Sequence, residues 1–332
     1  MVNSNGQRKR IGVLGAGHLG RIHVQQLKEL PEWDLVGVYD PHPEKCEALI
    51  NEFGVAILPS VEALISGVDA VDVVTPTLTH HRLAAQALDA GRHVFIEKPI
   101  TNTLDEARDL VERAAAKGLI VQVGHVERFN PAFAVAEPFL HDPMFIEAHR
   151  LAQFNPRGTD VSVVLDLMIH DIDIVLHVVK SEVVQVNASG VAVVSDTPDI
   201  ANARIAFANG CVANLTASRI SLKNMRKSRF FQRDAYISVD MLDKTTEIVR
   251  MRHVEGEPDP FAVTIDLGEG KGLREIGFEK PEVPKLNAIR EELRAFGASV
   301  RANAPAVVTA AQGAAALELA HRVLEGMAVQ KA

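Results

Sequence analysis

The sequence predicts an α/β protein: a doubly wound parallel sheet, followed by an α+β domain with a large open, mostly antiparallel sheet. Three observations predict it. A glycine-rich turn joins a strand to a helix near residue 15, strand and helix patterns then alternate, and period-2 strand patterns take over from about residue 145. A chain of 332 residues is long enough for two hydrophobic cores. We therefore assign residues 1–124 to the first domain and 125–332 to the second.

Composition restricts the class of function. The chain is 47% hydrophobic and 23% charged, and its formal net charge of −8 argues against nucleic acid or an acidic membrane as a partner. The two cysteines, Cys46 and Cys211, lie far apart and have no metal-ligand spacing, which is typical of reduced thiols in the cytoplasm. We recognise neither a signal peptide nor a membrane span. These features favour a cytoplasmic protein that acts on a small molecule.

The first strand–turn–helix unit predicts a dinucleotide site. The apolar run Ile11–Leu14 leads into G-x-G-x-x-G, formed by Gly15, Gly17 and Gly20, and the pattern then becomes helical. The first glycine permits a tight turn, and the second lets backbone N–H groups approach a pyrophosphate. The third lets the helix pack close to the strand. This arrangement is that of the Rossmann fold.

A second strand, residues 34–40, predicts which dinucleotide binds. It ends at Asp40, 20 residues after Gly20, where a carboxylate accepts hydrogen bonds from the ribose hydroxyls of adenosine. Pro41 follows, and no Arg stands in this turn to hold a 2′-phosphate, which Asp40 would also repel. We therefore expect NAD rather than NADP as the cofactor.

The alternation continues along the first domain. Thr103 and Glu106 form a capping-box pattern at the start of the last helix of this part. The predicted helices span 43–53, 80–91 and 103–118, and the predicted strands span 70–77, 93–99 and 119–125. Ligands of such sheets bind beyond the carboxyl ends of the strands. The segments VVTPT, IEKP and VGHVERF stand at those ends.

The second domain reads as an open sheet with helices. Asn209-Gly210 lies between two alternating runs and predicts a hairpin turn. Strands are predicted within 145–154, 183–195, 201–220 and 234–241, and residues 285–328 return to helices that we expect to pack back on the first domain. Because large one-sided sheets often bury their open face on another subunit, we expect a homodimer or homotetramer.

Residues 166–173, DLMIHDID, place ionisable groups in an apolar, helix-like stretch. Asp166 and His170 are four apart, so on a helix they share one face. One interpretation is a structural Asp–His hydrogen bond. The other is an acid/base pair at the floor of a pocket, and the choice depends on what the rest of the chain supplies.

The motifs together resemble the glucose–fructose oxidoreductase / inositol dehydrogenase / MocA (Gfo/Idh/MocA) family. The resemblance covers both domains and rests on GAGHLG at 15–20, Asp40, TPTLTH at 75–80, EKP at 97–99 and DLMIHDID. It implies a catalytic set of Lys98, Asp166 and His170. The cofactor-binding residues that it implies are Gly15, Gly17, His18, Leu19, Gly20, Asp40, Thr75, Pro76, His80, Glu97 and Lys98. The chain departs from the family pattern at Thr77, where many members have Asn.

The implied set suits oxidation of a hydroxyl by hydride transfer. Histidine side chains in general can exchange a proton near neutral pH, so His170 could take the hydroxyl proton, while Asp166 would orient it and stabilise its charged form. Lys98, hydrogen-bonded to the same hydroxyl, would stabilise negative charge on oxygen. A zinc site at His125, His170 and the aspartates is the chemical alternative, but no ligand spacing is diagnostic and we expect no metal.

Basic residues suggest an anionic substrate. The segment 219–233, which we call the basic segment, contains no acid and six cations, namely Arg219, Lys223, Arg226, Lys227, Arg229 and Arg233. It is either a solvated strand edge or subunit interface, or a site for a phosphorylated or nucleotide-linked substrate. Arg157, just before the catalytic helix, is a second candidate.

Within the family, residues 123–133, 149–160, 201–221 and 234–240 resemble the UDP-N-acetylglucosamine 3-dehydrogenases. That resemblance implies NAD-dependent oxidation of the sugar 3-hydroxyl on the way to lipid A. It also implies substrate contacts from Lys98, Arg128, Arg157, Asp166, His170 and Arg219. The alternatives are a dehydrogenase of a free sugar or inositol, and a non-enzymatic NAD-sensing regulator, which would need none of the three catalytic residues.

Overall fold

The computed structural model describes residues 8–155, 161–254, 262–268 and 272–331. The chain divides into two compact units, and each is described by itself. The first comprises Met1–Phe129 and Leu286–Glu318, and the second comprises Asn130–Lys285 and Leu319–Ala332. None of the described helices is long and apolar enough to cross a bilayer.

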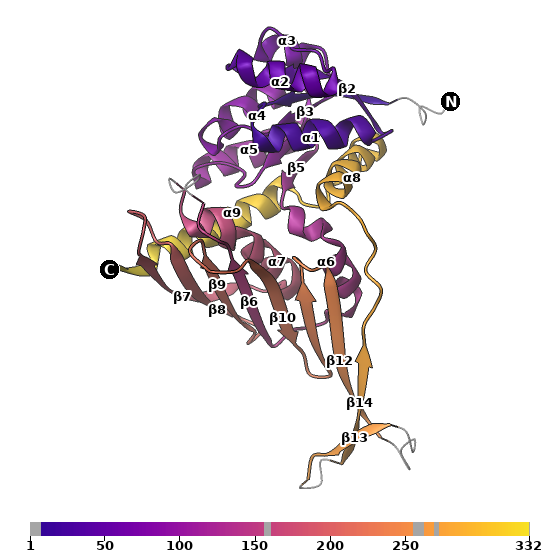
Figure 1. Ribbon diagram of the computed structural model, residues 1–332, viewed down its shortest axis with the longest axis vertical. Helices are drawn as coiled ribbons and strands as arrows, with labels where there is room; N and C mark the ends of the chain where they lie inside the picture. Colours follow the sequence, from indigo (N-terminus) through magenta and orange to yellow (C-terminus); the bar gives the residue numbers. More distant parts are fainter. Residues whose placement is uncertain (1–7, 156–160, 255–261, 269–271, 332) are drawn as a thin grey trace. The chain divides into compact units, whose positions relative to one another are not determined.

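The first unit is a parallel sheet between helices (Figure 1). Among the described residues its strands are β1 (Lys9–Leu14), β2 (Trp33–Tyr39), β3 (Ala70–Val73), β4 (His93–Glu97) and β5 (Val121–Gly124), in the order β2-β1-β3-β4-β5. Every neighbouring pair is parallel, which confirms the doubly wound sheet. The helices between the strands are α1 (His18–Glu29), α2 (Pro43–Phe53), α3 (Val61–Ser66), η1 (Thr77–Thr79), α4 (His80–Asp89) and α5 (Leu104–Lys117).

Local sequence rules account for most of these boundaries. The Thr103 hydroxyl oxygen accepts from the Glu106 backbone N–H, and the Glu106 carboxylate accepts from the Thr103 backbone N–H, so the predicted capping box starts α5. Gly118 ends the same helix in the left-handed conformation. The short helix α3 was not predicted, because six residues give too little periodicity to distinguish it from a loop.

A segment near the carboxyl end of the chain completes the core of the first unit. In α8 (Ala288–Ala302), the Leu293 carbonyl accepts a 2.9 Å hydrogen bond from the Trp33 indole, and the Phe296 ring lies 5.4 Å from the Trp33 ring. The Gln122 side chain donates to the Glu292 carbonyl at 2.7 Å. The first sheet therefore closes its core with residues synthesised long after its last strand. Helix α9 (Ala310–Glu325) follows.

The second unit contains a large, mostly antiparallel sheet, as predicted. Its described strands run in the order β13-β14-β12-β11-β10-β6-β9-β8-β7-β15, and only the β6–β9 and β7–β15 pairs are parallel. The bounds are β6 (Phe145–Leu151), β7 (Val183–Ala192), β8 (Ile200–Phe207), β9 (Val212–Ser218), β10 (Met225–Phe231), β11 (Ala235–Asp240), β12 (Thr245–His253), β13 (Val263–Asp266), β14 (Leu273–Glu279) and β15 (Met327–Lys331). The predicted Asn209-Gly210 turn joins β8 to β9, with Gly210 at φ +87°.

Helices cover one face of this sheet (Figure 1). Helix α6 (Pro131–Ala136) packs on β11 and β12, and α7 (Ile169–Val179) packs on β6 and β9. The shorter turns of this part are η2 (Val126–Phe129), η3 (Glu137–Phe139) and η4 (Val164–Met168). A buried, bidentate ion pair fixes α7 to the sheet, because Asp171 accepts from Arg150 Nε and Nη2, each at 2.9 Å.

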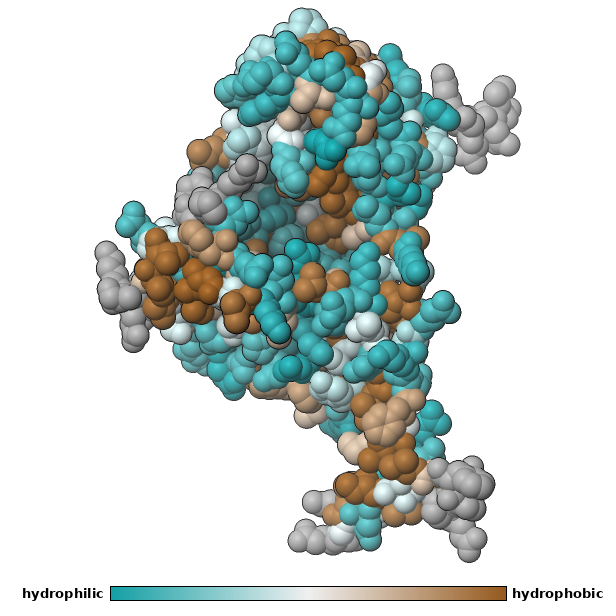
Figure 2. Space-filling view, viewed as in Figure 1, coloured by the Kyte–Doolittle hydropathy of each residue, from teal (hydrophilic) through white to brown (hydrophobic). Residues whose placement is uncertain are grey.

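The β13–β14 hairpin extends beyond the rest of the sheet (Figure 1). Hydrophobic side chains gather on it (Figure 2), among them Val263, Ile265 and Phe278, which is 70% exposed. No strand of β10, β12, β13 or β14 was predicted, because mixed polar and apolar runs such as TTEIVRMRH resemble a solvated segment until their neighbours are known.

Candidate active site

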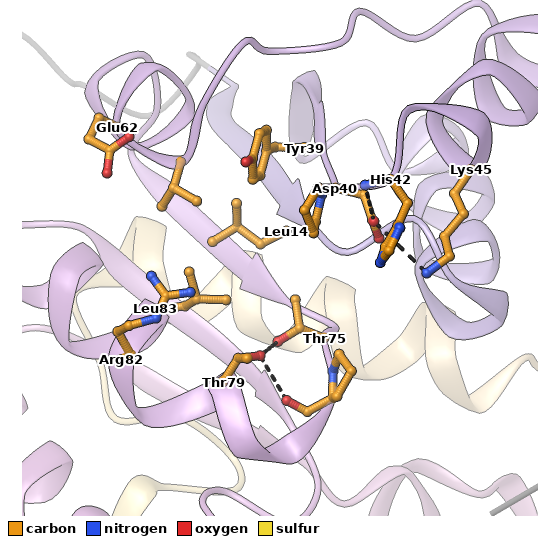
Figure 3. A pocket seen from close by; sticks show the side chains of 13 residues that line it. Leu14, Tyr39, Asp40, His42, Lys45, Glu62, Thr75, Thr79, Arg82 and Leu83 are labelled. Carbon is orange, nitrogen blue, oxygen red and sulfur yellow. Dashed lines mark hydrogen bonds and ion pairs between the residues drawn. The ribbon is translucent and has the colours of Figure 1, made fainter.

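A pocket of about 420 Å³ lies at the carboxyl ends of the parallel strands (Figure 3). Strand β1 pairs with β2 on one side and β3 on the other, so the chain reverses its direction of travel across the sheet here. Ligands of doubly wound sheets bind at this switch point. The lining residues come from the ends of these strands and from the helices that follow, and include Leu14, Tyr39, Asp40, Lys45, Thr75 and Arg82.

The glycine-rich turn has the shape that a pyrophosphate needs. Gly15 has φ +109°, and a Cβ there would lie 2.4 Å from the Val74 carbonyl oxygen. A Cβ on Gly20 would lie 2.0 Å from the Gly15 oxygen, so only glycine lets α1 pack this close to the turn. A Cβ on Gly17 would meet no atom within 4 Å, because this backbone faces open space. No side chain caps α1, so its first N–H groups are available to an anion.

Asp40 shapes the pocket beside this turn. Its Oδ2 accepts the Ala16 N–H at 2.8 Å and its Oδ1 accepts the His42 N–H at 2.9 Å. The Lys45 ammonium lies 4.0 Å from Oδ1 (Figure 3). The carboxylate therefore ties the turn after β2 to the glycine-rich turn, in addition to offering acceptors to a ribose. The residues of this chain fit NAD.

Replacing Asp40 with alanine is expected to raise the Kd for NAD and to narrow the preference for NAD over NADP. The change removes both the ribose acceptor and the charge that repels a 2′-phosphate, and it leaves Lys45 in the same pocket. Calorimetric titration of both cofactors measures the two constants. Tighter binding of NADP than of NAD by the unmodified protein would contradict the assignment of Asp40. Glu44→Ala, an exposed change in the next helix, is the control.

The turn after β3 is held by hydrogen bonds among its own residues. The Thr79 hydroxyl donates toward Thr75 Oγ1 at 2.7 Å and toward the Pro76 carbonyl at 2.8 Å. The His80 ring is 1% exposed, with Nδ1 2.9 Å from the Pro99 oxygen and Nε2 2.8 Å from the Thr75 oxygen. Burial lowers the pKa of His80. His80 therefore connects this turn to the E-K-P turn. Because its ring nitrogens face the backbone oxygens of Thr75 and Pro99, we expect His80 to affect cofactor binding only by positioning these two turns.

Lys98 follows β4 directly and is half-buried. Its backbone N–H donates to Glu97 Oε2 at 3.1 Å. Glu97 itself points into the interior, where His23 and Asp72 also lie. The structure thus adds two residues, His23 and Asp72, that sequence reasoning missed beside the predicted lysine. An aspartate inside the all-buried strand AVDV was the pattern that could have revealed them.

Asp166 and His170 lie in consecutive helical segments of the second unit. Asp166 is in η4, a π-helical turn, and His170 is in the first turn of α7. Single π-turns within helices are frequent at functional sites. Both side chains are half-buried, whereas Asp171 is 4% exposed and bonded to Arg150. The structure therefore distinguishes Asp171, which is buried in an ion pair with Arg150, from Asp166, which is partly exposed.

The basic residues have several different surroundings. Arg219 is 7% exposed and its guanidinium donates to the Val161 carbonyl, and Arg128 is also 7% exposed. Arg157 lies outside the described residues. Strand β10, in the middle of the basic segment, runs between β6 and β11, so the strand-edge alternative does not hold for residues 225–231. Arg229 on β10 is paired with Glu147 at 3.0 Å.

Among the described residues, one group of three could place ligand atoms around a metal ion. It consists of His23, Glu97 and Glu292, whose donor atoms lie within 4.8 Å of one another. His125 and His170, the sequence candidates for a zinc site, do not belong to it.

Cys211 is buried, and burial raises the pKa of its thiol to about 11.

Comparison with known proteins places the chain in a family. The model described as "Oxidoreductase family, NAD-binding Rossmann fold" (GFO_IDH_MocA) matches residues 9–125, and the GFO/IDH/MocA C-terminal domain model matches residues 135–234. The chain is 37% identical over 315 residues to a UDP-N-acetylglucosamine 3-dehydrogenase of Acidithiobacillus ferrooxidans, covering 95% of this chain and 96% of that one. The chain belongs to the GFO/IDH/MocA oxidoreductase family. The predicted resemblance and the NAD cofactor are thereby confirmed.

Other members of the GFO/IDH/MocA family are also similar. The solved structure of the A. ferrooxidans UDP-N-acetylglucosamine 3-dehydrogenase GnnA matches with a TM-score of 0.86 at 36% identity, over 97% of this chain and 98% of that one. The scyllo-inositol 2-dehydrogenase (NAD(+)) of Bacillus subtilis is 32% identical over 233 residues, which are 64% of this chain and 68% of the relative. The scyllo-inositol dehydrogenase of Lactobacillus casei shares the fold, with a TM-score of 0.77 at 21% identity over 97% of this chain and 96% of that chain.

Proposed function

We propose that this enzyme oxidises the 3-hydroxyl of UDP-N-acetylglucosamine to a ketone, with NAD as the hydride acceptor. The observation that carries the proposal is the 37% identity to a UDP-N-acetylglucosamine 3-dehydrogenase along 95% of the chain. The match covers 95% of the chain and therefore extends into both units, of which the first contains Lys98 and the second contains the Asp166–His170 pair. A regulator that only senses NAD would need none of these three side chains.

Each residue of the proposed set has one task. NAD bound at the switch point supplies a hydride acceptor. The glycine-rich turn and Asp40 hold it, while His170 takes the proton of the sugar hydroxyl on a ring nitrogen. Asp166 orients the imidazole and stabilises its charged form. The Lys98 ammonium donates a hydrogen bond to the same oxygen and stabilises the negative charge that develops there.

A diphosphate on the substrate gives the basic residues a purpose in a chain of net charge −8. Arg128, Arg157 and Arg219 are the proposed contacts, together with cations of the basic segment. Guanidinium groups bind phosphate with two parallel hydrogen bonds, and each charge-assisted bond is worth roughly 1.5–3 kcal/mol. A sugar without the nucleotide could form none of these bonds.

UDP-N-acetylglucosamine is therefore expected to exceed free N-acetylglucosamine in kcat/KM by at least roughly tenfold for each phosphate hydrogen bond that the free sugar cannot form. The experiment follows the absorbance of reduced cofactor while the protein is incubated with NAD and a panel of UDP-sugars, free sugars and inositols. Arg157→Ala should raise KM for the UDP-sugar far more than KM for NAD. Arg204→Ala, which alters an exposed arginine bonded to Asn214, is the control.

A free sugar or inositol that reacts as well as the UDP-sugar would support the second candidate, an inositol or sugar dehydrogenase. That candidate is favoured by the 32% identity to the B. subtilis scyllo-inositol 2-dehydrogenase, which extends over 64% of this chain.

We further propose that the enzyme works in the cytoplasm as a homodimer or homotetramer, on the route to lipid A. The identity to the UDP-N-acetylglucosamine enzyme supports the pathway, and the placement of the described helices on one face of the large sheet supports an oligomer (Figure 1).

A further inference from the structure

We propose that His23 is a positioning residue for Lys98, acting through Glu97, and that its imidazole works as a permanently charged imidazolium inside the first unit. The inference rests on the proposed role of Lys98 in catalysis. It concerns four side chains that share one buried site within the first unit: His23 of α1, Asp72 of β3, Glu97 of β4 and Glu292 of α8.

The geometry of this site is that of an imidazole between two carboxylates. His23 Nδ1 lies 2.9 Å from Asp72 Oδ2, and His23 Nε2 lies 3.2 Å from Glu97 Oε1. His23 and Asp72 are fully buried, and the Phe95 ring packs against the His23 ring with the two centroids 5.6 Å apart. The Nδ1–Asp72 contact is a hydrogen bond, whereas the Nε2–Glu97 contact is an ion pair by distance and lacks the alignment of a hydrogen bond. An imidazolium would place a positive charge between the two carboxylates, and a neutral imidazole would leave both of their negative charges buried without a counter-charge from His23.

Charge balance favours the same state. Burial alone would lower the pKa of His23, but the charges of Asp72 and Glu97 more than offset it and raise it well above its ordinary value. Burial would raise the pKa of Glu97, yet His23 and Lys98 hold it below its ordinary value. Burial also raises the pKa of Asp72, against the effect of His23. The site therefore holds Glu97 as a carboxylate because His23 is charged.

Glu292 adds a third carboxyl group to the site. It is fully buried on α8, and burial together with the charges of Glu97, Asp72 and Glu127 raises its pKa well above its ordinary value. Burial and these charges therefore favour its neutral form. The groups that face His23 from the elements packed around it are thus the carboxylates of Asp72 and Glu97 and the carboxyl group of Glu292, whose pKa is also raised by the charge of Glu127 on η2.

Glu97 transmits this arrangement to the active site. Its Oε1 faces His23 and its Oε2 accepts the Lys98 backbone N–H at 3.1 Å. A Cβ at Gly124 on β5 would lie 3.0 Å from Glu97 Oε1, so the neighbouring strand keeps a space for this carboxylate. Lys98 thus follows a residue whose carboxylate lies within ion-pair distance of His23 through Oε1 and accepts a hydrogen bond from the Lys98 backbone through Oε2. A displacement of about 1 Å at a reacting group can cost 10²-fold in rate.

His23→Gln removes the charge and keeps a side chain of similar reach. Without the imidazolium, burial favours the protonated form of Glu97, whose hydroxyl no longer accepts from Lys98 as a carboxylate does. We expect kcat to fall roughly 10- to 100-fold at pH 7 and to recover as the pH rises and Glu97 ionises, while KM for NAD changes less than threefold. The control is Val24→Ala, which removes two methyl groups from a buried side chain next to His23 on the same helix. It should lower the Tm and leave the pH dependence of kcat unchanged.

The ionisation state is tested separately from turnover. In protein labelled with ¹⁵N-histidine, the ring assigned by its loss in His23→Gln should remain an imidazolium at pH 8. Asp72→Asn should lower the pH at which this ring loses its proton, and it serves if His23→Gln does not fold. A ring that is neutral at pH 7, or an Asp72→Asn ring that titrates as in the unmodified protein, overturns the inference. So does a His23→Gln profile parallel to that of the unmodified enzyme.

Metal analysis distinguishes the remaining chemistry at this site. A stoichiometric metal ion in the purified protein, lost in His23→Gln, would mean that His23, Glu97 and Glu292 bind a cation, and would overturn the imidazolium. If none of the sugars is oxidised, the proposed function fails while the spectroscopic result still decides the charge of His23. If the UDP-sugar reacts and the ring is neutral, the function stands and this inference fails.

Discussion

Replacing His170 with alanine is expected to lower kcat by roughly 10²–10⁴-fold and to leave the Kd for NAD unchanged. The imidazole is the proposed acceptor of the hydroxyl proton, and without it the proton must leave to water. The NAD pocket belongs to the first unit, whereas His170 belongs to the second, so cofactor affinity should not follow the loss of turnover. Initial rates at saturating substrate and a calorimetric titration of NAD measure the two quantities.

Two further changes make this result specific. Asp166→Asn should do less damage than His170→Ala, because it keeps the shape and removes only the charge that supports the imidazolium. His177→Ala removes a second histidine from α7, one that pairs with Glu137 at 2.5 Å, and should turn over normally. Normal turnover by His170→Ala would show that the Asp166–His170 pair is structural, and Lys98 would become the leading base.

Lys98→Met is expected to lower kcat by roughly 10²–10³-fold, the effect of removing one donor to a developing oxyanion. Methionine keeps most of the length of the side chain and loses the ammonium. Because the backbone N–H of residue 98 still donates to Glu97, the turn after β4 should persist and NAD should still bind. Steady-state kinetics with the UDP-sugar and the NAD titration together separate chemistry from binding.

Lys117→Met is the matched control for this change. Lys117 lies at the end of α5 and donates to the Asp89 carbonyl at 3.0 Å, away from the carboxyl edge of the sheet. Its loss should lower stability slightly and leave kcat within about twofold, as for other surface changes. A Lys98→Met enzyme with unchanged kcat would remove the lysine from the mechanism and leave His170 to act alone.

The cofactor half of the site could be predicted because its chemistry is local. Gly15 needs a positive φ, Gly20 needs the absence of a Cβ, and both requirements act within a few residues of the glycine itself. Asp40 is fixed by the length of one strand–helix–strand unit. Sequence alone therefore predicts the fold of the first unit, its cofactor and the edge at which the cofactor binds.

The buried histidine site could not be predicted for the opposite reason. On the sequence His23 is one polar residue of a helix that also carries Arg21 and Lys28, and nothing nearby shows that it faces inward. Its partners come from β3, β4 and α8, and Asp72 is 49 residues away. The same limit applies to DLMIHDID, where only the position of Arg150 on β6 distinguishes Asp171 from Asp166.

The closure of the first core by α8 has a consequence for how the chain matures on the ribosome. The five parallel strands are complete at residue 124, but Trp33 has neither its carbonyl partner nor the Phe296 ring until α8 has been synthesised. Until then the nascent Rossmann segment would expose apolar surface and leave the His23 cluster open to water. Chaperone engagement and protease sensitivity of stalled nascent chains should therefore persist past residue 124 and end once α8 has left the exit tunnel. A premature stop codon between residue 124 and the end of α8 would yield a nucleotide-binding unit with an incomplete hydrophobic core, which we expect cellular proteases to degrade.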